Sequence, residues 1–563
     1  MRTLLWPVGL ALAAGCAEYD GAAETPVGLV VTPLTGVACG DPDAPSASPN
    51  PFSEAPNVTI AVRGVDTETG VYGTLVKRSQ TLREGRGVAL KVPEGPDRDV
   101  TVFAQGGSGS WFGRDTGLDV VRNTDVAAAM TLTRYDGFSC APTVDGAINT
   151  VFPAAVTMGD GRILVVGGFT QVTSDGGISK LTGATPAAWV FDPRTGLSES
   201  VGNLGAGQGR GAATMVWLEE TDKVLILGGA TELEVDTAKP FPFHLDPTKA
   251  KDDYFLFDPA TDTFSAGTEA MRSRRAFARA AALADGTVLV TGGGAWPLDD
   301  QDDFEADIAD IFDPEDNDRA GGFLDIPKMR SFYPRAGHSL TFLRNTDEGL
   351  TQLLLWGGTT PGASLNHPAE VFKQSGRQQD GVNGTFAEVT LLGSEAPAFT
   401  FFHEVTRLSG NRFIATGGAP YEGGALQAPR SDEAWLLTFT TDSASPTLIV
   451  QRMPGFGPGR VFHSALSDDL RHVAVVGGWG PTTAVAAPDH VLSFDVEAGA
   501  AGQAFWTQAA NAGAQSTPRG GHAATLTPAG TVFLVGGELS WDQASAAKRA
   551  AAEIYTPAFV TLP

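Results

Sequence analysis

Val532-Phe533-Leu534-Val535-Gly536-Gly537, a short hydrophobic run that ends in two glycines, is the last of seven copies of one pattern. The copies end in Gly167-Gly168, Gly228-Gly229, Gly292-Gly293, Gly357-Gly358, Gly417-Gly418, Gly477-Gly478 and Gly536-Gly537. Successive copies lie 59 to 65 residues apart in the 563-residue chain. A constant period of this kind is typical of a repeat architecture, in which each repeat is one supersecondary unit.

Each repeat has the pattern of four short antiparallel strands. A first strand, such as 337–342, precedes a tight turn that is often Asp-Gly, and the second strand carries the hydrophobic run. A third strand ends in Asp-Pro in the first three repeats, and a fourth strand follows the next turn. Four antiparallel strands in every repeat predict the blades of a β-propeller, in which each blade covers its apolar faces against its neighbours.

The combination of Gly-Gly after the second strand, aromatic-Asp-Pro after the third and Arg before the first resembles kelch repeats over residues 145–563. This resemblance implies a seven-bladed kelch-type β-propeller of the superfamily that includes the central domain of galactose oxidase. Closure of the ring matters, because an open ring leaves an exposed sheet edge. We predict that 559–562 forms the outer strand of blade seven; the alternative is that Thr143-Val144 pairs onto that blade.

Residues 27–140 have a different pattern of short alternating segments, such as 57–62 and 100–104, separated by Gly, Pro and Asp turns. Strands at this spacing predict a small antiparallel β-sandwich. The segment 90–102 resembles prealbumin-like or immunoglobulin-like modules of bacterial surface proteins. The predicted fold class is therefore all-β, with a small β-sandwich domain before the propeller.

Residues 1–16 predict a targeting segment. A positive Met1-Arg2 precedes an apolar stretch, 4–14, that is too short to span a membrane. The sequence Leu12-Ala13-Ala14-Gly15-Cys16 resembles a bacterial lipobox, with Ala13 where Leu is the commonest residue, and this implies that Cys16 is lipidated. Ordinary secretion, with Ala11-Leu12-Ala13 as the cleavage site, is the alternative.

The chain has three cysteines, Cys16, Cys39 and Cys140. Lipidation of Cys16 accounts for the odd one and leaves Cys39 and Cys140 to form a disulfide in an oxidising compartment. Residues 17–26 are small and polar and predict a tether. No later segment reaches the ~18 consecutive apolar residues of a transmembrane helix. We therefore expect a lipid-anchored protein of the cell envelope, with the outer membrane favoured over the inner one, that faces the periplasm or the cell surface.

The chain carries 39 basic and 65 acidic residues, for a formal net charge of −26. A surface as acidic as this repels the phosphate backbone of nucleic acid and anionic lipid. The charge therefore argues against a nucleic-acid partner. We expect protein or glycan partners at the cell envelope, contact with the membrane through the lipid anchor only, and a monomer.

Arginines and histidines recur at one position before the hydrophobic run. They are Arg275, Arg335, His338, His403, Arg460, His463, Arg519 and His522, with Arg210 as the counterpart in the second repeat. One interpretation is a ring of guanidinium and imidazole groups at the mouth of the central channel that binds an anion or a metal ion. The other is a structural role, in which each side chain bonds carbonyl groups of the adjoining blade. Zinc needs its ligands about 2 Å from one point, whereas residues on successive blades are spread around a ring, which favours the structural role.

The loops between the second and third strands are longest in blades one to three and are candidate ligand loops. Phe243, His244 and Trp296 are predicted to offer exposed side chains that contact a sugar or a protein; the alternative is that these loop residues pack on their own blade. The stretch 299–318 is densely acidic. Its first candidates for a Ca²⁺ site are Asp313, Glu315, Asp316 and Asp318, although the spacing of a calcium-binding loop is missing.

Sequence motifs of several enzyme classes are missing. Propellers that resemble galactose oxidase bind copper through two Tyr and two His, one Tyr being cross-linked to a Cys, and no Cys lies in 145–563. Gly-x-Ser-x-Gly, His-Glu-x-x-His and P-loop sequences are also missing. The sequence therefore favours a non-catalytic binding or scaffolding lipoprotein without a cofactor. The alternative is a carbohydrate-active enzyme (a glycan hydrolase, lyase or epimerase) that uses carboxylates at the propeller mouth.

Overall fold

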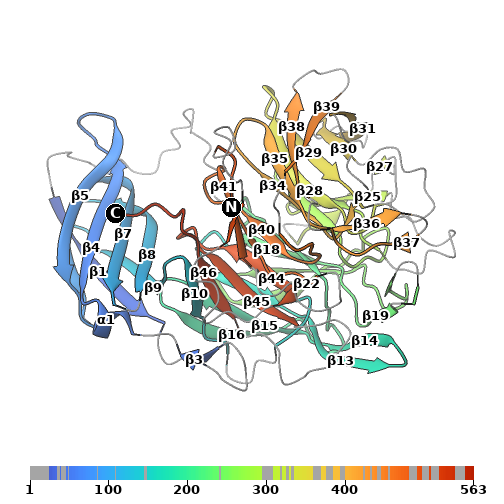
Figure 1. The fold of residues 1–563 in the computed structure, drawn as a ribbon, viewed down its shortest axis with the longest axis horizontal. Coiled ribbons are helices and arrows are strands. Elements are labelled where there is room, and N and C mark those ends of the chain that lie inside the picture. Colours follow the sequence, from blue (N-terminus) through green and yellow to red (C-terminus); the bar gives the residue numbers. More distant parts are fainter. Residues whose placement is uncertain are drawn as a thin grey trace.

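The computed structural model is all-β, with one short helix, α1 (Pro51–Glu54), among the residues it describes. These residues are 24–34, 38–39, 46–47, 50–84, 86–107, 109–144, 149–236, 238–239, 242–294, 308–316, 320–324, 329–330, 335–358, 369–375, 384–393, 400–422, 425–430, 434–440, 446–453, 457–480, 491–497, 506–508, 519–538 and 552–563. No helix within these residues is long and apolar enough to cross a membrane. The N-terminal part and the repeats lie side by side (Figure 1).

Within the described residues, each Gly-Gly copy follows the second strand of its own antiparallel sheet, which we number repeat sheet 1 to 7 in chain order. Sheets 1 to 3 are β11(Ala154–Thr157)-β12(Ile163–Val166)-β15(Ala187–Asp192)-β16(Leu197–Asn203), β17(Thr214–Leu218)-β18(Lys223–Leu227)-β21(Tyr254–Asp258)-β22(Thr263–Ala266) and β23(Arg279–Ala282)-β24(Val288–Thr291)-β25(Ile308–Asp313)-β26(Gly322–Phe323). Sheets 4 and 5 are β28(Ser339–Asn345)-β29(Thr351–Trp356)-β30(Ala369–Gln374)-β31(Gly384–Glu388) and β34(Glu404–Arg407)-β35(Arg412–Thr416)-β38(Ala434–Thr440)-β39(Thr447–Arg452), with β32(Thr390–Leu392) parallel to β39. Sheets 6 and 7 are β40(Ser464–Leu466)-β41(His472–Val476)-β42(Val491–Asp495)-β43(Trp506–Gln508) and β44(Gly520–Leu526)-β45(Val532–Glu538)-β46(Glu553–Thr556)-β10(Gly137–Cys140).

The first strands of consecutive repeat sheets touch one another, and β44 of sheet 7 touches β11 of sheet 1. One residue at or just before the start of each of these strands has a left-handed backbone with φ between 52° and 64°: Phe152, Ala212, Phe277, Gly337, Phe402, Phe462 and Gly521. Their backbone groups bond from sheet to sheet, for example Ala212 N–H to Phe152 O at 2.8 Å and Phe152 N–H to Gly521 O at 2.7 Å. The inner edges of the repeat sheets therefore follow one closed circle.

The circle closes through β10, which pairs with β46 from Gly137 opposite Thr556 to Cys140 opposite Glu553. The prediction of an outer strand at 559–562 is wrong, because β10 already occupies that edge and the chain turns at 558–560. The alternative pairing of Thr143-Val144 is also wrong, since those residues lie beyond the end of β10. The principle that an open sheet edge must be covered was sound, but the covering strand comes from the end of the N-terminal part.

The N-terminal part forms one seven-stranded sheet. Its order is β5(Tyr72–Thr81)-β4(Asn57–Val65)-β7(Gly95–Gly106)-β8(Gly109–Val120)-β9(Val126–Arg134)-β1(Glu24–Pro33)-β6(Val88–Pro93), with β1 parallel to β9. The end strands β5 and β6 come into contact, so the sheet is nearly closed on itself, where two sheets of a sandwich were expected. Alternate residues of β1 are buried, and the buried side chains of the strands form one apolar interior. The expected tether at 17–26 overlaps this strand, which begins at Glu24.

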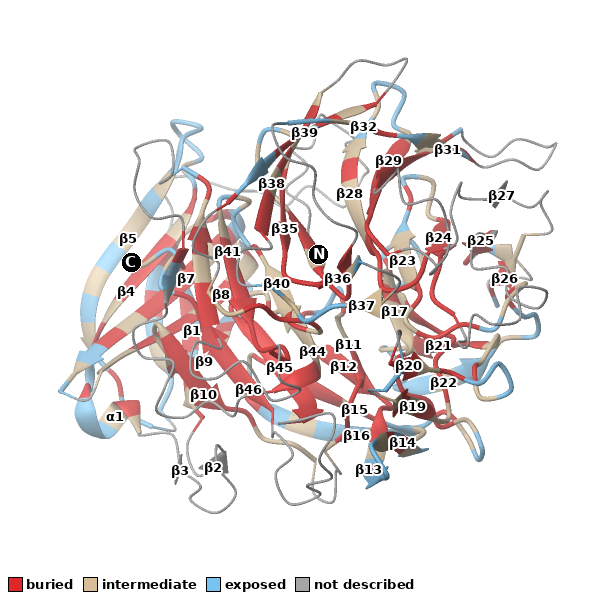
Figure 2. Cartoon of the chain, turned by 45° about the vertical axis from the view of Figure 1, so that its right-hand side comes forward, coloured by how far each residue is buried: buried red, intermediate tan, exposed pale blue. Residues whose placement is uncertain are grey.

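Additional short strands come from the loops. Those after β12 and β18 form the sheet β13(Phe169–Asp175)-β14(Ile178–Ala184)-β19(Leu233–Asp236)-β20(Phe243–His244), and the loop region around sheet 5 forms β33(Thr400–Phe401)-β36(Ala419–Glu422)-β37(Ala425–Leu426). The pair β2(Ala38–Cys39)-β3(Ser46–Ala47) stands apart, and β27(Met329–Arg330) pairs with β25. Burial is concentrated in the second and third strands of the repeat sheets, whereas β5 and β13 carry many exposed residues (Figure 2).

Polar contacts hold the N-terminal part against repeat sheets 7 and 1. Thr133 Oγ1 lies 2.7 Å from Thr556 Oγ1, and Tyr135 donates its hydroxyl to Ala558 O at 2.7 Å. Arg194 Nη2 lies 3.0 Å from Asp115 Oδ2. These contacts fix the face on which the charged cluster described below is assembled.

Candidate functional site

The arginines that were candidates for a channel-mouth ring are buried. Arg210, Arg275, Arg335, Arg460 and Arg519 are each at most 2% exposed. Each donates from Nη1 to the carbonyl of the first glycine of its own repeat sheet, over 2.6 to 3.2 Å. Four of them also meet a carboxylate on the third strand, as Arg335 Nε meets Glu370 Oε2 at 2.7 Å. Their guanidinium groups therefore bind backbone and carboxylate oxygens of their own repeat sheets and do not face a channel mouth.

The paired glycines connect each sheet to the next. The N–H of the second glycine donates to a carbonyl just before the first strand of the following sheet. The acceptor is a threonine for Gly358 and Gly537, and an arginine for Gly168, Gly229, Gly418 and Gly478, as for Gly229 and Arg275 O at 2.9 Å. The first glycine needs to be glycine, because its φ is positive and a Cβ on Gly228 would lie 2.3 Å from the same carbonyl oxygen. The motif that marks the repeats in the sequence is thus the junction between neighbouring sheets.

The four histidines of the candidate ring bond the preceding sheet. Their Nε2 atoms lie 2.9 to 3.1 Å from Thr291 Oγ1, Trp356 O, Thr416 Oγ1 and Ser464 Oγ, for His338, His403, His463 and His522 in that order. Burial, with nearby arginines adding to it, lowers the pKa of His403 and of His522 to about 3, and lowers the pKa of His338 and His463 well below the usual value. These imidazoles are neutral at physiological pH, and the geometry accounts for them by bonds between sheets.

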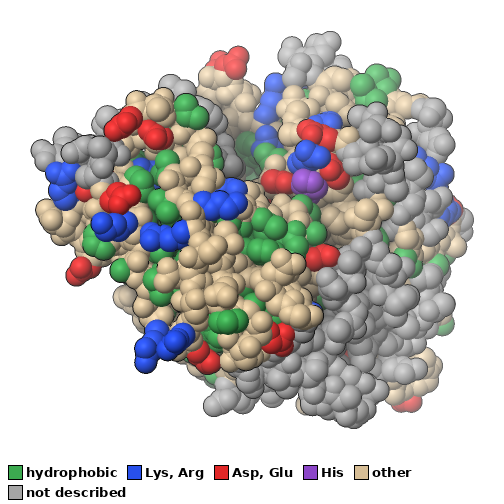
Figure 3. Space-filling model, turned by 60° about the vertical axis from the view of Figure 1, so that its left-hand side comes forward, with side chains coloured by type: hydrophobic (Ala, Val, Ile, Leu, Met, Phe, Trp, Pro, Cys, Tyr) green, Lys and Arg blue, Asp and Glu red, His purple; other side chains and the backbone are tan. Residues whose placement is uncertain are grey.

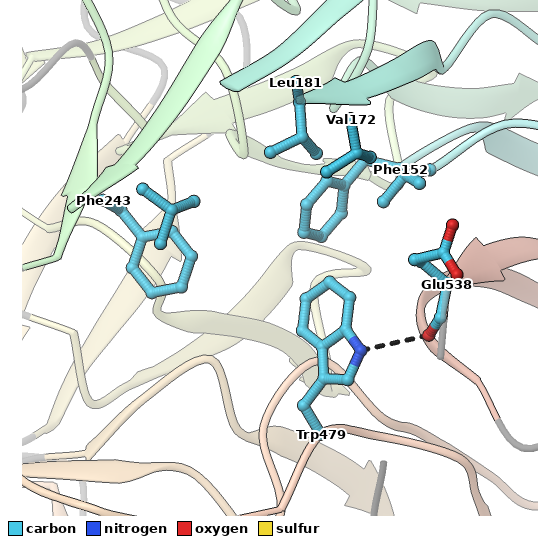
Figure 4. A pocket seen from close by; sticks show the side chains of 8 residues that line it. Phe152, Val172, Leu181, Phe243, Trp479 and Glu538 are labelled. Atoms are coloured by element: carbon cyan, nitrogen blue, oxygen red, sulfur yellow. Dashed lines mark hydrogen bonds between the residues drawn. The ribbon is translucent and has the colours of Figure 1, made fainter. Parts of the chain in front are cut away.

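Aromatic rings fill the centre of the circle of sheets. Phe152 lies 5.0 Å from both Phe277 and Phe462, and Phe402 stacks on Phe462 at 4.2 Å. The small pocket beside them is apolar, and Val172 and Leu181 of the β13–β14 hairpin cover it (Figure 4). Trp479 donates to the backbone carbonyl of Glu538 there, at 3.1 Å. The loops of repeats one and two therefore close this end of the axis.

The expectation that Phe243 is an exposed ligand contact is wrong. The side chain is 2% exposed and packs against Phe402 at 4.8 Å, because the β19–β20 pair folds back onto the centre. His244 is partly exposed at the end of β20. Trp296 lies outside the described residues.

The calcium candidates do not form a site in the part of the chain that the structure describes. Asp313 is buried and accepts the backbone N–H of Glu315 at 3.0 Å, which caps a turn. Asp318 lies outside the described residues. Among those described, no three His, Cys, Asp or Glu side chains are placed to hold a metal ion.

Of the cysteines, Cys140 is disulfide-bonded. Cys39 ends β2, whose side chains are not described, so its pairing with Cys140 stays a prediction. Cys16 lies outside the described residues.

A different charged cluster lies where the N-terminal part meets repeat sheet 6. Arg114 of β8 places Nη2 2.9 Å from Asp99 Oδ2 of β7, and its Nη1 lies 3.8 Å from Asp468 Oδ2. Asp468 belongs to the turn between β40 and β41. Tyr72 of β5 donates its hydroxyl to Asp99 at 3.2 Å. Two carboxylates from distant parts of the chain thus meet on one guanidinium.

This cluster is reachable from solvent, unlike the buried arginines. The side chain of Asp468 is 40% exposed and that of Arg114 is 23% exposed. Burial raises the pKa of Asp468, with Asp469 and Asp99 adding to the rise and Arg114 opposing it. Basic and acidic side chains gather around a histidine on this face (Figure 3). The site therefore offers a carboxyl group that is biased toward its protonated form beside a second carboxyl group with two hydrogen-bond donors.

A small pocket adjoins the cluster between the N-terminal part and repeat sheets 7 and 1. Its wall includes Arg114 and four threonines, Thr131, Thr133, Thr527 and Thr531. The 527–531 turn also touches Asp468, since a Cβ on Gly530 would lie 2.6 Å from Asp468 Oδ2. The threonine hydroxyls are buried and bonded within the protein, as Thr527 Oγ1 is to Thr531 Oγ1 at 2.7 Å, so this pocket supports the cluster from below.

Sequence reasoning missed this cluster, because its members come from β5, β7, β8 and the 467–471 turn. One local signal was present. Repeats one and three have a short Asp-Gly turn after the first strand, whereas repeat six has Ser467-Asp468-Asp469-Leu470-Arg471-His472. A charged turn in place of a tight hairpin turn marks a departure from the repeat that serves another purpose.

No family model matches the sequence, and no curated protein matches it either. One similar solved structure is a fungal alcohol oxidase of the AA5 family in complex with copper, with 15% identity over 73% of this chain and 75% of that chain, at a TM-score of 0.48. Another is YjhT, with 12% identity over 62% of this chain and 96% of that chain, at a TM-score of 0.40. Likeness at these identities concerns the fold and does not assign a reaction.

These comparisons correct two sequence-based expectations. A non-catalytic binding or scaffolding module was expected, whereas a similar structure is an oxidase. No cofactor was expected either, whereas that oxidase is in complex with copper. The described residues of this chain do not fit copper, since the four imidazoles of the inner circle are each bonded to a neighbouring sheet and no three metal-binding side chains converge.

Proposed function

We propose that this protein is a carbohydrate-active hydrolase whose acid and base are Asp468 and Asp99. The observation that carries the proposal is the meeting of these two carboxylates, from two parts of the chain, on Arg114. Ligand sites occur preferentially where domains meet. Pairs of carboxyl groups in unlike surroundings are the common equipment of glycoside hydrolysis.

The surroundings suggest the role of each carboxyl group. Burial raises the pKa of Asp468, which suits a general acid that protonates the glycosidic oxygen. Asp99, held by Arg114 and Tyr72, takes a proton from the attacking water. The C–O bond to the leaving sugar breaks, that sugar keeps the proton from Asp468, and the hydroxyl of water bonds to the anomeric carbon.

The ring of Tyr72 supports a glycan as substrate. It is 58% exposed, and it pairs across the hairpin with Val65, which is 44% exposed, while Val71 is 64% exposed. An exposed aromatic ring offers an apolar face with a polar edge, which suits the C–H face of a pyranose.

The proposal includes the architecture that holds the site. We propose that the repeat sheets are the seven blades of a kelch-type β-propeller of the galactose oxidase-like superfamily. The circle of inner-strand contacts and the glycine junctions support this. The turns between first and second strands, which include Asp468, then surround one mouth of the propeller, and the N-terminal part lies beside that mouth.

We also propose that Cys16 is lipidated and that the protein is anchored to the cell envelope, on the strength of the lipobox-like sequence before it. Mass spectrometry of the mature N-terminus tests this. The expected product begins with acylated Cys16, and an unmodified chain that begins at Ala14 would contradict the proposal.

The hydrolase is tested by assaying the full chain against a panel of neutral glycans for release of reducing ends. With an active glycan found, Asp468→Asn is expected to lower kcat by about 100-fold or more, since general acid catalysis contributes factors of about 10²–10⁴. Asp99→Asn is expected to have an effect of similar size. The loss should be greatest for substrates with poor leaving groups, which depend most on protonation.

A matched control is available in repeat sheet 1. Asp160 lies in the equivalent turn, its side chain is 42% exposed against 40% for Asp468, and it pairs with Arg162 away from the cluster. Asp160→Asn is expected to keep full activity. A panel without turnover, or an Asp468→Asn variant as active as the wild type, would overturn the proposal.

A further inference from the structure

The turn that carries Asp468 is held in an unfavourable backbone shape by local bonds. Leu470 has φ of 59°, a left-handed backbone that is unfavourable for a residue with a Cβ. Asp469 closes the turn, because its Oδ1 accepts the backbone N–H groups of Arg471 and His472 at 2.9 and 2.7 Å. The position of Asp468 therefore depends on what holds Asp469.

His472 connects this turn to two other parts of the chain. Its Nδ1 lies 2.6 Å from Asp469 Oδ2, and its Nε2 lies 3.3 Å from Asp495 Oδ2 of β42. The imidazole also stacks on Phe559 of the C-terminal segment, with centroids 4.9 Å apart and planes 9° from parallel. One side chain thus joins the turn, the third strand of repeat sheet 6 and the segment after β46.

Both polar partners of His472 are acceptors. A neutral imidazole has one N–H and an imidazolium has two, so that only the charged form donates to both carboxylates. Asp495 stays ionised, because Arg471 bonds it at 2.8 Å and holds its pKa well below the usual value. The charged groups around His472 are Asp468, Asp469 and Arg471 from its own turn, and Asp495 and Glu497 from β42 and the residues after it.

We infer that His472 is a positioning residue for Asp468: its imidazole ties the 467–471 turn to β42 and holds Asp468 against Arg114. The inference rests on the role proposed above for Asp468. Without this side chain, the contacts to Asp469 and Asp495 are lost and the turn loosens. Activity then depends on a residue that touches no substrate.

The first test does not need a substrate. Methyl NMR of the full chain compares the Leu470 signals of the wild type, His472→Gln and Asp495→Asn. Each variant alters the link between the turn and β42, so the Leu470 methyl signals of both are expected to move away from the wild-type positions in the same direction. Leu470 signals in His472→Gln that match the wild type would overturn the inference.

The second test uses kinetics on the glycan found above. His472→Gln is expected to lower kcat about tenfold or more with a smaller change in KM, because a misplaced catalytic group costs rate. If Asp468→Asn keeps full activity, the proposed function fails. If Asp468→Asn is inactive while His472→Gln matches the wild type at every pH, the positioning role alone fails.

Discussion

Two arginine–carboxylate pairs, one at the inner circle and one beside the N-terminal part, differ in their access to water. At the inner circle, Arg335 and Glu370 are 1% and 0% exposed, and Arg335 also bonds the glycine junction. At the face beside the N-terminal part, Arg114 and Asp468 are 23% and 40% exposed and lie 3.8 Å apart. The same residue types hold sheets together in one region and remain available to a ligand in the other.

The difference follows from desolvation. A buried pair must keep both partners, because removing one leaves an uncompensated charge away from water. Such a pair cannot exchange protons during a reaction without destabilising the fold. A partly exposed pair loses little when it opens. Charged residues that recur in every repeat and are buried therefore stabilise the fold. Charged residues that occur in one repeat only and are exposed are the candidates for function.

The largest expected effect breaks a buried pair. Glu370→Gln leaves Arg335 without its carboxylate, and the free energy of unfolding is expected to fall by about 3–5 kcal/mol. Asp468→Asn, which alters the exposed pair, is expected to change it by less than about 1 kcal/mol. Urea unfolding of both variants measures the contrast. Equal losses in the two variants would show that exposure does not separate the regions.

The repeat architecture could be predicted from the sequence because each repeat carries its own copy of the pattern within about 60 residues. A hydrophobic run with Gly-Gly is needed wherever the second strand ends, since the positive φ and the close carbonyl recur at each junction. The arginine position was equally regular, and its burial is the reason for the regularity. Closure by β10 was not accessible, because 137–140 reads as the last strand of the N-terminal part and only the pairing with Glu553–Thr556 shows its place.

The charged cluster could not be predicted from the sequence either, because its residues meet only in the folded chain. Asp99, Arg114 and Asp468 are each unremarkable in their own segments, and their meeting depends on how the N-terminal part lies against repeat sheet 6. For Phe243, the sequence predicted an exposed side chain, and the structure shows a buried one. An aromatic residue in a long loop predicts exposure, but here the loop strand turns inward and supplies an apolar side chain to the centre.

The second contrast tests the glycine junctions. Gly228 and Gly176 have nearly the same φ, 59° and 60°, but a Cβ on Gly228 would lie 2.3 Å from Arg275 O, whereas nothing lies within 4 Å of a Cβ on Gly176. Gly176→Ala is expected to cost about 1 kcal/mol for the backbone alone. Gly228→Ala adds overpacking of about 1–3 kcal/mol. Thermal unfolding compares them, and similar melting temperatures would contradict the close approach.

The smallest expected effect is a pH dependence of stability at the inner circle. Burial lowers the pKa of His403 to about 3 in the folded protein, against about 6.5 when unfolded. The unfolded chain therefore binds a proton below pH 6.5 that the folded protein refuses, so this stability is fully present above pH 6.5 and is lost as pH falls toward 3. One such histidine changes the free energy of unfolding by up to about 1.4 kcal/mol per pH unit in this window. His403→Gln is expected to flatten the measured slope between pH 6.5 and 5 by this amount. An unchanged slope in His403→Gln would mean that His403 takes up its proton in the folded protein, and that burial does not exclude the charged imidazole from the inner circle.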